Sequence, residues 1–309
     1  MPHLVDITLS LFLASPPPAL AYGAGRKGVS DAFALWAGEW LDLLHSMGFL
    51  VEVPPSLRHA APAGPRARKP GAPPHGHYAR LGGCCDALRD FPAFWARYAP
   101  LKDRIEFCPN DTAGCATALA VLWLSHGGAR VAGALGGSAA HGPAAGPALE
   151  EAALCLAAQG QDAGLRRLDL LPRAATLLRE AGLALSRHKA VLGADIFAVE
   201  SGIHVDGIAK APHLYEPFSP ESVGLTRQVV MGRHSGLGAV RLKARQMGLP
   251  LPEAALRPVL GAVHALALRQ QSSLCDAQFA ALCRPHLPPA IAQPRRLTAP
   301  GAPAEVDRA

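Results

Sequence analysis

Two short segments hold most of the side chains that could do chemistry. The first reads Glu200-Ser201-Gly202-Ile203-His204-Val205-Asp206-Gly207. The pattern predicts a short strand followed by a polar loop that exposes Glu200, Ser201, His204 and Asp206. Histidine changes its charge near neutral pH, which suits proton transfer, but a lone loop histidine is more often structural or simply exposed. Both interpretations stay open on these residues alone.

The second segment follows a predicted strand at 104–107 and offers Cys108, Asn110 and Asp111 as metal ligands. A thiol must lose its proton to bind a metal well, and an amide is a weak neutral ligand. One carboxylate beside them does not complete a site. His141, in the glycine-rich stretch 136–142, is a candidate replacement ligand, although a loop histidine without such a role is the simpler interpretation.

The elements that must position these residues alternate between strand and helix. Strands are predicted at 4–9, 49–53, 104–107 and 130–135, and helices at 31–47, 86–98, 113–125, 148–158 and 171–181. Such alternation is typical of a parallel α/β fold. An eight-unit barrel usually needs about 250 residues, and the pattern changes after residue 185. The sequence therefore predicts an α/β fold: a truncated or incomplete TIM-type (β/α) barrel over 1–185.

A small, mainly helical C-terminal subdomain is predicted at 186–285, with helices at 236–248, 252–268 and 275–283. Residues 60–77 are rich in Pro, Gly, Ala and Arg without a hydrophobic period, which indicates a linker or an insertion in the barrel. Residues 286–309 are rich in Pro and Ala and are expected to form a disordered tail.

Composition excludes several classes of protein. The net charge is +6, and no basic helix is interleaved with aromatic residues, so we expect no nucleic-acid surface. The seven cysteines include no CxxC pair, which argues against a disulfide framework or a zinc knuckle. No signal peptide or apolar stretch of about 18 residues is found, so we expect a cytoplasmic protein without a membrane span.

Several motifs resemble those of one enzyme family. Glu200–Gly207 is similar to the "ESGIHxDG" signature of α-isopropylmalate and homocitrate synthases. Leu214–Gly224 resembles the family's "YEPFDPExVG", and Gly232–Gly236 resembles its "GKHSG". Further likeness is found at Val5–Leu9 ("VDTTL"), at Ile105–Phe107 with the helix that follows, and at Ala148–Glu151 ("ALEE"). The resemblance covers residues 4–9 and about 103–248, and three ordered motifs are far more specific than one.

The resemblance implies a fold, a reaction and partners. Members of this family condense acetyl-CoA with a 2-oxo acid and then hydrolyse the thioester, on a TIM barrel followed by a helical subdomain, in an intertwined dimer. A divalent metal (Mg, Mn or Zn) at the barrel mouth polarises the oxo acid. The resemblance assigns catalytic roles to His204 and Tyr215, supplied to the partner subunit, and to Glu200. It assigns substrate binding to Thr8 and Ser201.

The chain departs from the family pattern where the metal should bind. The family's "TLRDG" supplies an arginine and a metal-binding aspartate, but Ser10 and Leu11 stand at these places. Its "EFHxHND" aims two imidazoles at the metal, because alternate strand residues face the same way. Cys108 and Asn110 replace them here, and Asp111 follows.

Three interpretations remain open. The first is an acyltransferase with a rearranged metal site. The short chain after residue 285 favours the homocitrate or citramalate kind, such as the synthases that supply homocitrate in nitrogen fixation. The second is a pseudoenzyme that pairs with an active synthase, as a heterodimer, or binds a ligand without turnover. The third is a drifted gene product that folds poorly. The residues do not identify the 2-oxo acid.

Overall fold

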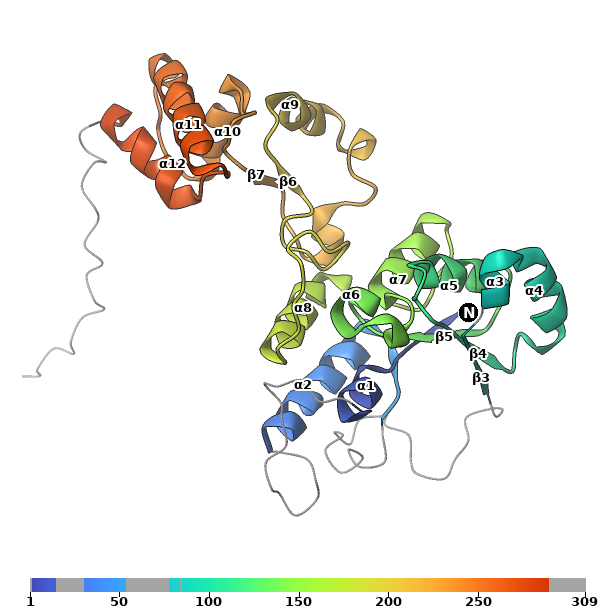
Figure 1. Ribbon diagram of the computed structural model, residues 1–309. Helices are drawn as coiled ribbons and strands as arrows, with labels where there is room; N and C mark the ends of the chain where they lie inside the picture. The colour runs from blue at the N-terminus through green and yellow to red at the C-terminus, as the bar shows by residue number, and fades with distance from the viewer. Residues whose placement is uncertain (1, 15–30, 54–77, 84, 289–309) are drawn as a thin grey trace, which may run out of the picture. The chain divides into compact units, whose positions relative to one another are not determined.

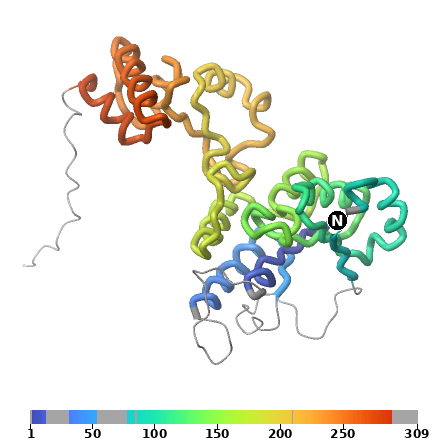
Figure 2. The backbone as a smooth tube through the Cα atoms, in the orientation of Figure 1, coloured from blue at the N-terminus to red at the C-terminus, as the bar shows by residue number. Residues whose placement is uncertain are grey.

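A computed structural model describes residues 2–14, 31–53, 78–83 and 85–288. The predicted linker at 60–77 and most of the predicted tail at 286–309 lie outside this range. The chain divides into two compact units: unit 1 runs to Phe197 and includes Pro220–Thr226, and unit 2 comprises Ala198–Ser219 and the residues from Arg227 onward. The sequence placed the change of character at residue 185, twelve residues before the first crossing between units (Figure 2).

Unit 1 is built on a parallel five-stranded sheet in the order β2-β1-β5-β4-β3 (Figure 1). The strands are β1 (His3–Asp6), β2 (Leu50–Val51), β3 (Ala79–Gly83), β4 (Ile105–Pro109) and β5 (Arg130–Gly133). In the register, Val5 lies opposite Leu50 on one side and Ala132 on the other. The first strand of the sheet therefore pairs in parallel with the last, as it does where a (β/α) barrel closes.

Eight helices in the described part of unit 1 surround this sheet. They are α1 (Thr8–Ala14), α2 (Asp31–Met47), α3 (Cys85–Arg89), α4 (Phe91–Tyr98), α5 (Ala116–Ser125), α6 (Gly137–His141), α7 (Leu149–Ala158) and α8 (Leu171–Glu180). Trp40 of α2 contacts Asp6, and Trp123 of α5 stacks near Phe107. The register places Asp6 and Phe107 on the same face of the sheet. Helices α2 and α5 therefore pack on the same face of the sheet, as helices do in a (β/α) barrel.

The opposite face carries a row of charged side chains. Arg80, Glu106 and Arg130 lie side by side in the register, with 2.7 Å from Arg80 Nη2 to Glu106 Oε1 and 3.5 Å from Arg130 Nε to Glu106 Oε2. Arg80 also pairs with Glu52, which directly follows β2. This ion pair joins the two outer strands, so the sheet must curl. The prediction of an α/β fold with an incomplete TIM-type barrel is confirmed in this form.

Unit 2 is mainly helical, as predicted. It contains β6 (Ala198–Val199), β7 (Gln228–Val229), α9 (Gly202–Lys210), α10 (Leu237–Gln246), α11 (Leu256–Gln270) and α12 (Asp276–Cys283). The parallel pair β6–β7 and the helices share one apolar core. Its buried side chains include Val205, Met231, Val240, Val263 and Phe279.

Three local predictions were wrong. The strand predicted at 4–9 ends at Asp6, because the Asp6 carboxyl accepts hydrogen bonds from the Thr8 N–H and hydroxyl and so starts α1. The loop predicted to carry Glu200–Gly207 is instead mostly helix α9, which buries Val205 in the core of unit 2. Its two glycines hide the helical period. Strand β3 was missed, because its sequence ARLGG has no β-branched or aromatic residue.

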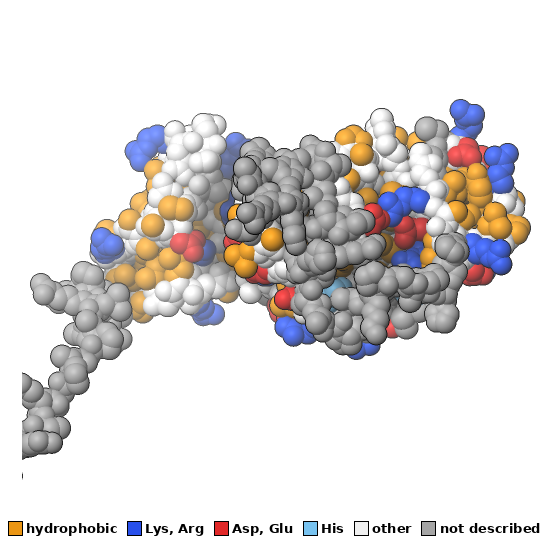
Figure 3. Space-filling view, turned by 90° about the horizontal axis from the view of Figure 1, so that it is seen from below, with side chains coloured by type: hydrophobic (Ala, Val, Ile, Leu, Met, Phe, Trp, Pro, Cys, Tyr) orange, Lys and Arg blue, Asp and Glu red, His pale blue; other side chains and the backbone are white. Residues whose placement is uncertain are grey.

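The predicted helix at 86–98 is split, as Pro92 suggested. Asp90 accepts the Ala93 N–H at 3.1 Å and caps α4, whose first turn holds the proline. No helix in the described part of the chain combines the length and the apolar character needed to cross a bilayer. Acidic and basic side chains are interspersed on the face drawn in Figure 3, with no single-sign block there.

Candidate functional site

His204 and Tyr215 are brought together within unit 2. His204 lies in the first turn of α9, and Tyr215 directly follows a short 3-10 turn at Pro212–Leu214. Their ring centroids are 5.8 Å apart in an edge-on arrangement. Both side chains are exposed to solvent, and Tyr215 keeps 45% of its accessible surface. An imidazole and a phenol placed in this way can offer and accept protons at one point on the surface.

Gly207 makes this pair possible. A Cβ atom on Gly207 would lie 2.2 Å from Tyr215 Oη and 2.4 Å from Cζ, so the phenol packs directly on the helix backbone. The helix start lies close to the third motif, since a Cβ on Gly202 would lie 3.4 Å from the backbone of Gly236, an ordinary van der Waals contact. Gly207 thus contacts Tyr215 of the second motif, and Gly202 contacts Gly236 of the third.

Glu200 is held in a different place from the His204–Tyr215 pair. Its carboxylate accepts the backbone N–H of His234 at 2.6 Å and the hydroxyl of Ser273 at 3.3 Å. A Cβ on Gly232 would lie 2.6 Å from the Glu200 carboxyl carbon, so a side chain at that position would displace the carboxylate. Ser201 precedes α9, and its carbonyl accepts the Val205 N–H. The catalytic role of Glu200 and the substrate role of Ser201 stay predictions.

A buried ion pair fixes the segment that carries Tyr215. The side chain of Glu216 is 7% exposed and accepts two hydrogen bonds from Arg227, at 2.8 Å from Nε and 2.6 Å from Nη2. Such a bidentate pair sets the direction of both side chains. Tyr215 is therefore anchored from behind by its neighbour, while its own ring rests on Gly207.

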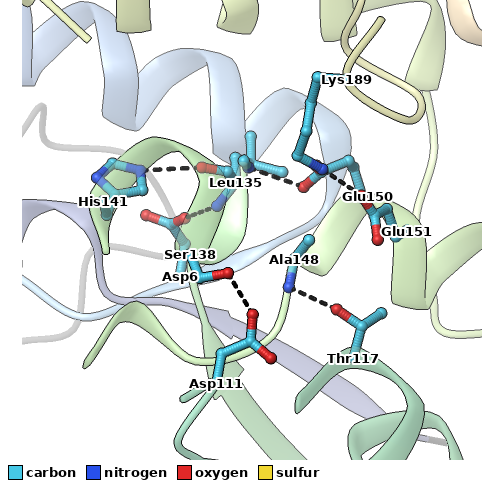
Figure 4. A network of polar contacts seen from close by, with 11 residues as sticks. Asp6, Asp111, Thr117, Leu135, Ser138, His141, Ala148, Glu150, Glu151 and Lys189 are labelled. Carbon is cyan, nitrogen blue, oxygen red and sulfur yellow. Dashed lines mark hydrogen bonds and ion pairs between the residues drawn. The ribbon is translucent and has the colours of Figure 1, made fainter. Parts of the chain in front are cut away.

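In unit 1, the predicted metal positions lie after β4 and are engaged with the protein. Asn110 Oδ1 accepts the Thr112 N–H at 2.8 Å, and Asp111 Oδ1 accepts the Ala116 N–H at 2.8 Å. Asp111 Oδ2 takes the Ser138 hydroxyl, as Figure 4 shows. Burial raises the pKa of the Cys108 thiol. These side chains close the connection from β4 to α5.

Asp6 and His141 form a second part of the same network (Figure 4). The buried Asp6 carboxyl accepts hydrogen bonds from Thr8, from Trp40 Nε1 at 3.2 Å and from the Leu135 N–H at 3.2 Å. Burial raises its pKa to about 6 in spite of these bonds. His141 Nε2 meets the Leu135 carbonyl at 2.9 Å, and burial lowers its pKa to about 4. Thr8 is fully buried, and its hydroxyl donates a hydrogen bond to Asp6.

Comparisons with known proteins find a domain family and several relatives. The domain family described as homocitrate synthase post-HMGL domain-like matches residues 191–271, which include the segments around Glu200, Tyr215 and Gly232. A 2-isopropylmalate synthase of Caldanaerobacter subterraneus subsp. tengcongensis is 42% identical over 98 residues, 32% of this chain and 26% of that protein. A homocitrate synthase of Methanocaldococcus jannaschii is 41% identical over 104 residues, 33% and 25% of the two chains. Residues 191–271 belong to this domain family, and the chain is related to isopropylmalate and homocitrate synthases over the matched parts.

Its match to other members is also partial. A 2-isopropylmalate synthase of Sulfolobus acidocaldarius is 35% identical over 162 residues, 52% of this chain and 41% of that protein. The chain thus spans less than half of the length of these curated relatives. The two outer strands of the sheet, β2 and β3, are consecutive strands along the chain.

The residues present do not fit the divalent metal of the isopropylmalate/homocitrate synthase family. Within the described ranges, no three His, Cys, Asp or Glu side chains gather where they could hold a metal ion. Cys108 stays protonated near neutral pH, since burial raises its pKa further. The side-chain oxygens of Asn110 and Asp111 accept hydrogen bonds from the backbone of Thr112 and Ala116. We therefore route no chemical step through a metal bound to this chain.

Two features of unit 2 were missed from the sequence. The first is the contact of Tyr215 with Gly207, and the second is a cavity beside Glu200 that Arg233 and His234 also line. The adjacent Arg233 and His234 of "GRHSG" gave a signal for the second. The signal was incomplete, because the carboxylate that faces them lies more than 30 residues earlier in the chain.

Proposed function

We propose that this chain is a non-catalytic relative that supplies its His204–Tyr215 pair to a full-length synthase of the family. The reaction of that partner is the condensation of acetyl-CoA with a 2-oxo acid. The observation that carries the proposal is that unit 2 holds an exposed and prearranged His204–Tyr215 pair, whereas the metal positions of unit 1 do not fit a metal.

The surroundings of the pair support a protein surface as its target. Ile203 and Leu214 precede His204 and Tyr215 in the chain and keep 81% and 72% of their accessible surface. Large apolar side chains clustered around two polar rings are typical of a surface that another protein covers. The pair itself has the acid–base chemistry that removal or return of a proton needs. The carbonyl-polarising metal would belong to the partner.

A complementation assay tests the proposal. The acceptor is a full-length homologue whose own signature histidine has been changed to alanine. We measure CoA release from acetyl-CoA with 2-oxoglutarate, pyruvate or 2-oxoisovalerate in the presence of Mg²⁺ or Mn²⁺. The chain alone should release no CoA, and adding it to the acceptor should restore release with at least one of the 2-oxo acids.

Matched variants locate the effect. His204→Ala and Tyr215→Phe should abolish or sharply reduce the restored activity. His188→Ala removes an exposed imidazole from unit 1 and should leave the restored activity unchanged. Failure to restore release in any mixture, or restoration that survives His204→Ala, would contradict the proposal.

A second function is that the chain is itself a synthase of the homocitrate or isopropylmalate type. The names of its relatives favour this function. The same assay separates the two functions. CoA release by the chain alone that disappears with EDTA and with His204→Ala would establish the second function and overturn the first.

A further inference from the structure

A polar cavity of about 240 Å³ lies within unit 2, away from the His204–Tyr215 pair. It is formed by three separate segments: Glu200 from the start of the signature, Arg233 and His234 from the "GRHSG" motif, and the end of α11 with the loop after it. Its lining includes Glu200, Arg233, His234, Leu268, Ser272 and Ser273. The proposed transfer of the His204–Tyr215 pair to a partner does not use this cavity.

The carboxylate of the cavity is held in place before any ligand arrives. The His234 N–H and the Ser273 hydroxyl each donate to one of its oxygens, and Gly232 provides the space for it. A carboxylate oxygen can accept two hydrogen bonds, so both oxygens keep a further acceptor position. The two donors that bind Glu200 are a backbone amide and a hydroxyl. Within the described residues, no cationic side chain pairs with it.

The cationic side of the cavity is also prearranged. Arg233 Nε donates to His234 Nε2 at 2.9 Å, which fixes the direction of the guanidinium and leaves the imidazole proton on Nδ1. In the described part of the chain, the two terminal nitrogens of Arg233 have no recorded acceptor. A guanidinium with two free N–H groups is suited to a bidentate contact with a carboxylate.

Two opposite charges therefore line one cavity without pairing with each other. In the described part of the chain no ion pair joins Glu200 to Arg233, so each charge can pair with a ligand in the cavity. The end of α11 adds partial negative charge on the side of Leu268, and this favours an ammonium group there. Ala267 and Leu268 give the cavity a small apolar wall.

We propose that this cavity binds a small zwitterion, of which a free α-amino acid is the simplest. Its ammonium group would lie against Glu200 and its carboxylate against Arg233. The volume suits a ligand of this size, and the hydroxyls of Ser272 and Ser273 can complete the hydrogen bonds. A dicarboxylate would meet Glu200 as a like charge, and a diamine would meet Arg233 in the same way.

The test is titration calorimetry of the full chain with each of the twenty common L-amino acids. At least one should bind with a Kd at or below the millimolar range. Two analogues of the best ligand show whether both of its charges contribute to binding. The corresponding 2-oxo acid lacks the ammonium group, and the decarboxylated amine lacks the carboxylate. Each should bind at least about tenfold more weakly, because each loses one charge-assisted contact.

Two isosteric variants probe the protein side. Glu200→Gln keeps an oxygen for the His234 N–H and leaves the Ser273 hydroxyl an NH₂ donor, so the fold is retained while the charge is lost. Arg233→Gln removes the guanidinium from a solvent-exposed position. Each variant should weaken binding about tenfold or more. Arg241→Gln and Glu253→Gln, which break an exposed ion pair elsewhere in unit 2, are the matched controls and should bind as the unmodified chain does.

The proposal is overturned if none of the twenty amino acids binds, if an analogue with one charge binds as tightly as the amino acid, or if binding survives both Glu200→Gln and Arg233→Gln. Circular dichroism and thermal unfolding of each variant show that a loss of binding is not a loss of fold. The test does not depend on synthase activity, so it can succeed or fail independently of the proposed function.

Discussion

Replacing Gly207 with alanine should separate the function of the His204–Tyr215 pair from the stability of unit 2. The new methyl group would lie 2.2 Å from Tyr215 Oη, a distance that no pair of unbonded heavy atoms tolerates. One of the two must move. Tyr215 is 45% exposed and belongs to a turn, whereas Gly207 lies inside a hydrogen-bonded helix. We therefore expect the phenol to swing out into solvent and α9 to stay intact.

The gain in helix stability and the loss of Tyr215 contact area have opposite signs and partly offset each other. An alanine in a helix interior is about 1 kcal/mol more favourable than a glycine. A fully buried aromatic side chain covers roughly 150–250 Å², so a tyrosine that is about half exposed loses roughly 100 Å² of contact when it leaves. At about 25 cal/mol per Å², that loss is at most about 2.5 kcal/mol. The net loss of stability should therefore stay below about 1.5 kcal/mol.

The loss of function should be much larger. With the phenol displaced, the 5.8 Å ring contact with His204 is broken, and the prearranged pair no longer exists. In the complementation assay, Gly207→Ala should behave like Tyr215→Phe or worse. The chemical shifts of the His204 ring protons should also move, since they no longer lie beside an aromatic ring.

Gly261→Ala is the matched control. Gly261 also lies in a helix, α11, and a Cβ there would meet nothing within 4 Å. This variant should gain up to about 1 kcal/mol of stability and keep full complementation. The reasoning is refuted if Gly207→Ala complements as well as the unmodified chain does. It is also refuted if the variant loses more than about 4 kcal/mol, because the helix, not Tyr215, would then have yielded.

Three further predictions concern unit 1. The raised pKa of Asp6 means that its folded form binds the proton more tightly than the unfolded chain, so its contribution to stability, about 3 kcal/mol, is present below pH 3.8 and lost as the pH rises through about 6. The lowered pKa of His141 works in the opposite direction, with stability lost as the pH falls from 6.5 towards about 4. The free energy of unfolding in urea is therefore measured for the chain and for Asp6→Asn, each at pH 4 and at pH 7. The difference between the two proteins gives the pH dependence that is due to Asp6. Lys189→Met leaves Glu150 buried without its ammonium partner and should cost about 3–5 kcal/mol in the same assay, and adding Glu150→Gln should recover part of that loss. Because burial raises the pKa of Cys108, its alkylation by iodoacetamide at pH 7 should be slower than that of a free cysteine peptide, and a rate equal to that of the peptide would contradict the buried environment.

The periodic elements of this chain could be predicted from sequence because each is a local pattern. Residues 31–47 form a helix within the predicted bounds, since Trp36, Trp40 and Leu44 recur at helical spacing and are all buried. The parallel α/β class followed from the alternation of strands with helices. The strand order did not follow, because the pairing of β1 with β5 joins residues more than 120 positions apart.

The site was less predictable, for a physical reason. Glycine disfavours a helix when it is considered alone, so Gly202 and Gly207 indicated a loop. The structure shows that Gly207 is required by Tyr215, a neighbour outside the helix, and that Gly202 contacts Gly236. A packing requirement of this kind has no signature in the local sequence. The same holds for Arg80, whose partners Glu52 and Glu106 lie on other strands.

The contacts among the three motifs of unit 2 affect what the motifs mean. Gly207, Gly232 and the Glu216–Arg227 pair all serve the packing of unit 2, whether or not the chain has a reaction to catalyse. The presence of these residues therefore indicates the fold of unit 2 and not a reaction. His204 and Tyr215 differ because both are exposed, although the Tyr215 ring also packs on Gly207. A chain that needed only the fold of unit 2 would have no physical reason to keep an imidazole and a phenol in contact on its surface, beside exposed apolar side chains. That pair is the part of the signature that requires a functional explanation, and a partner's active site supplies one.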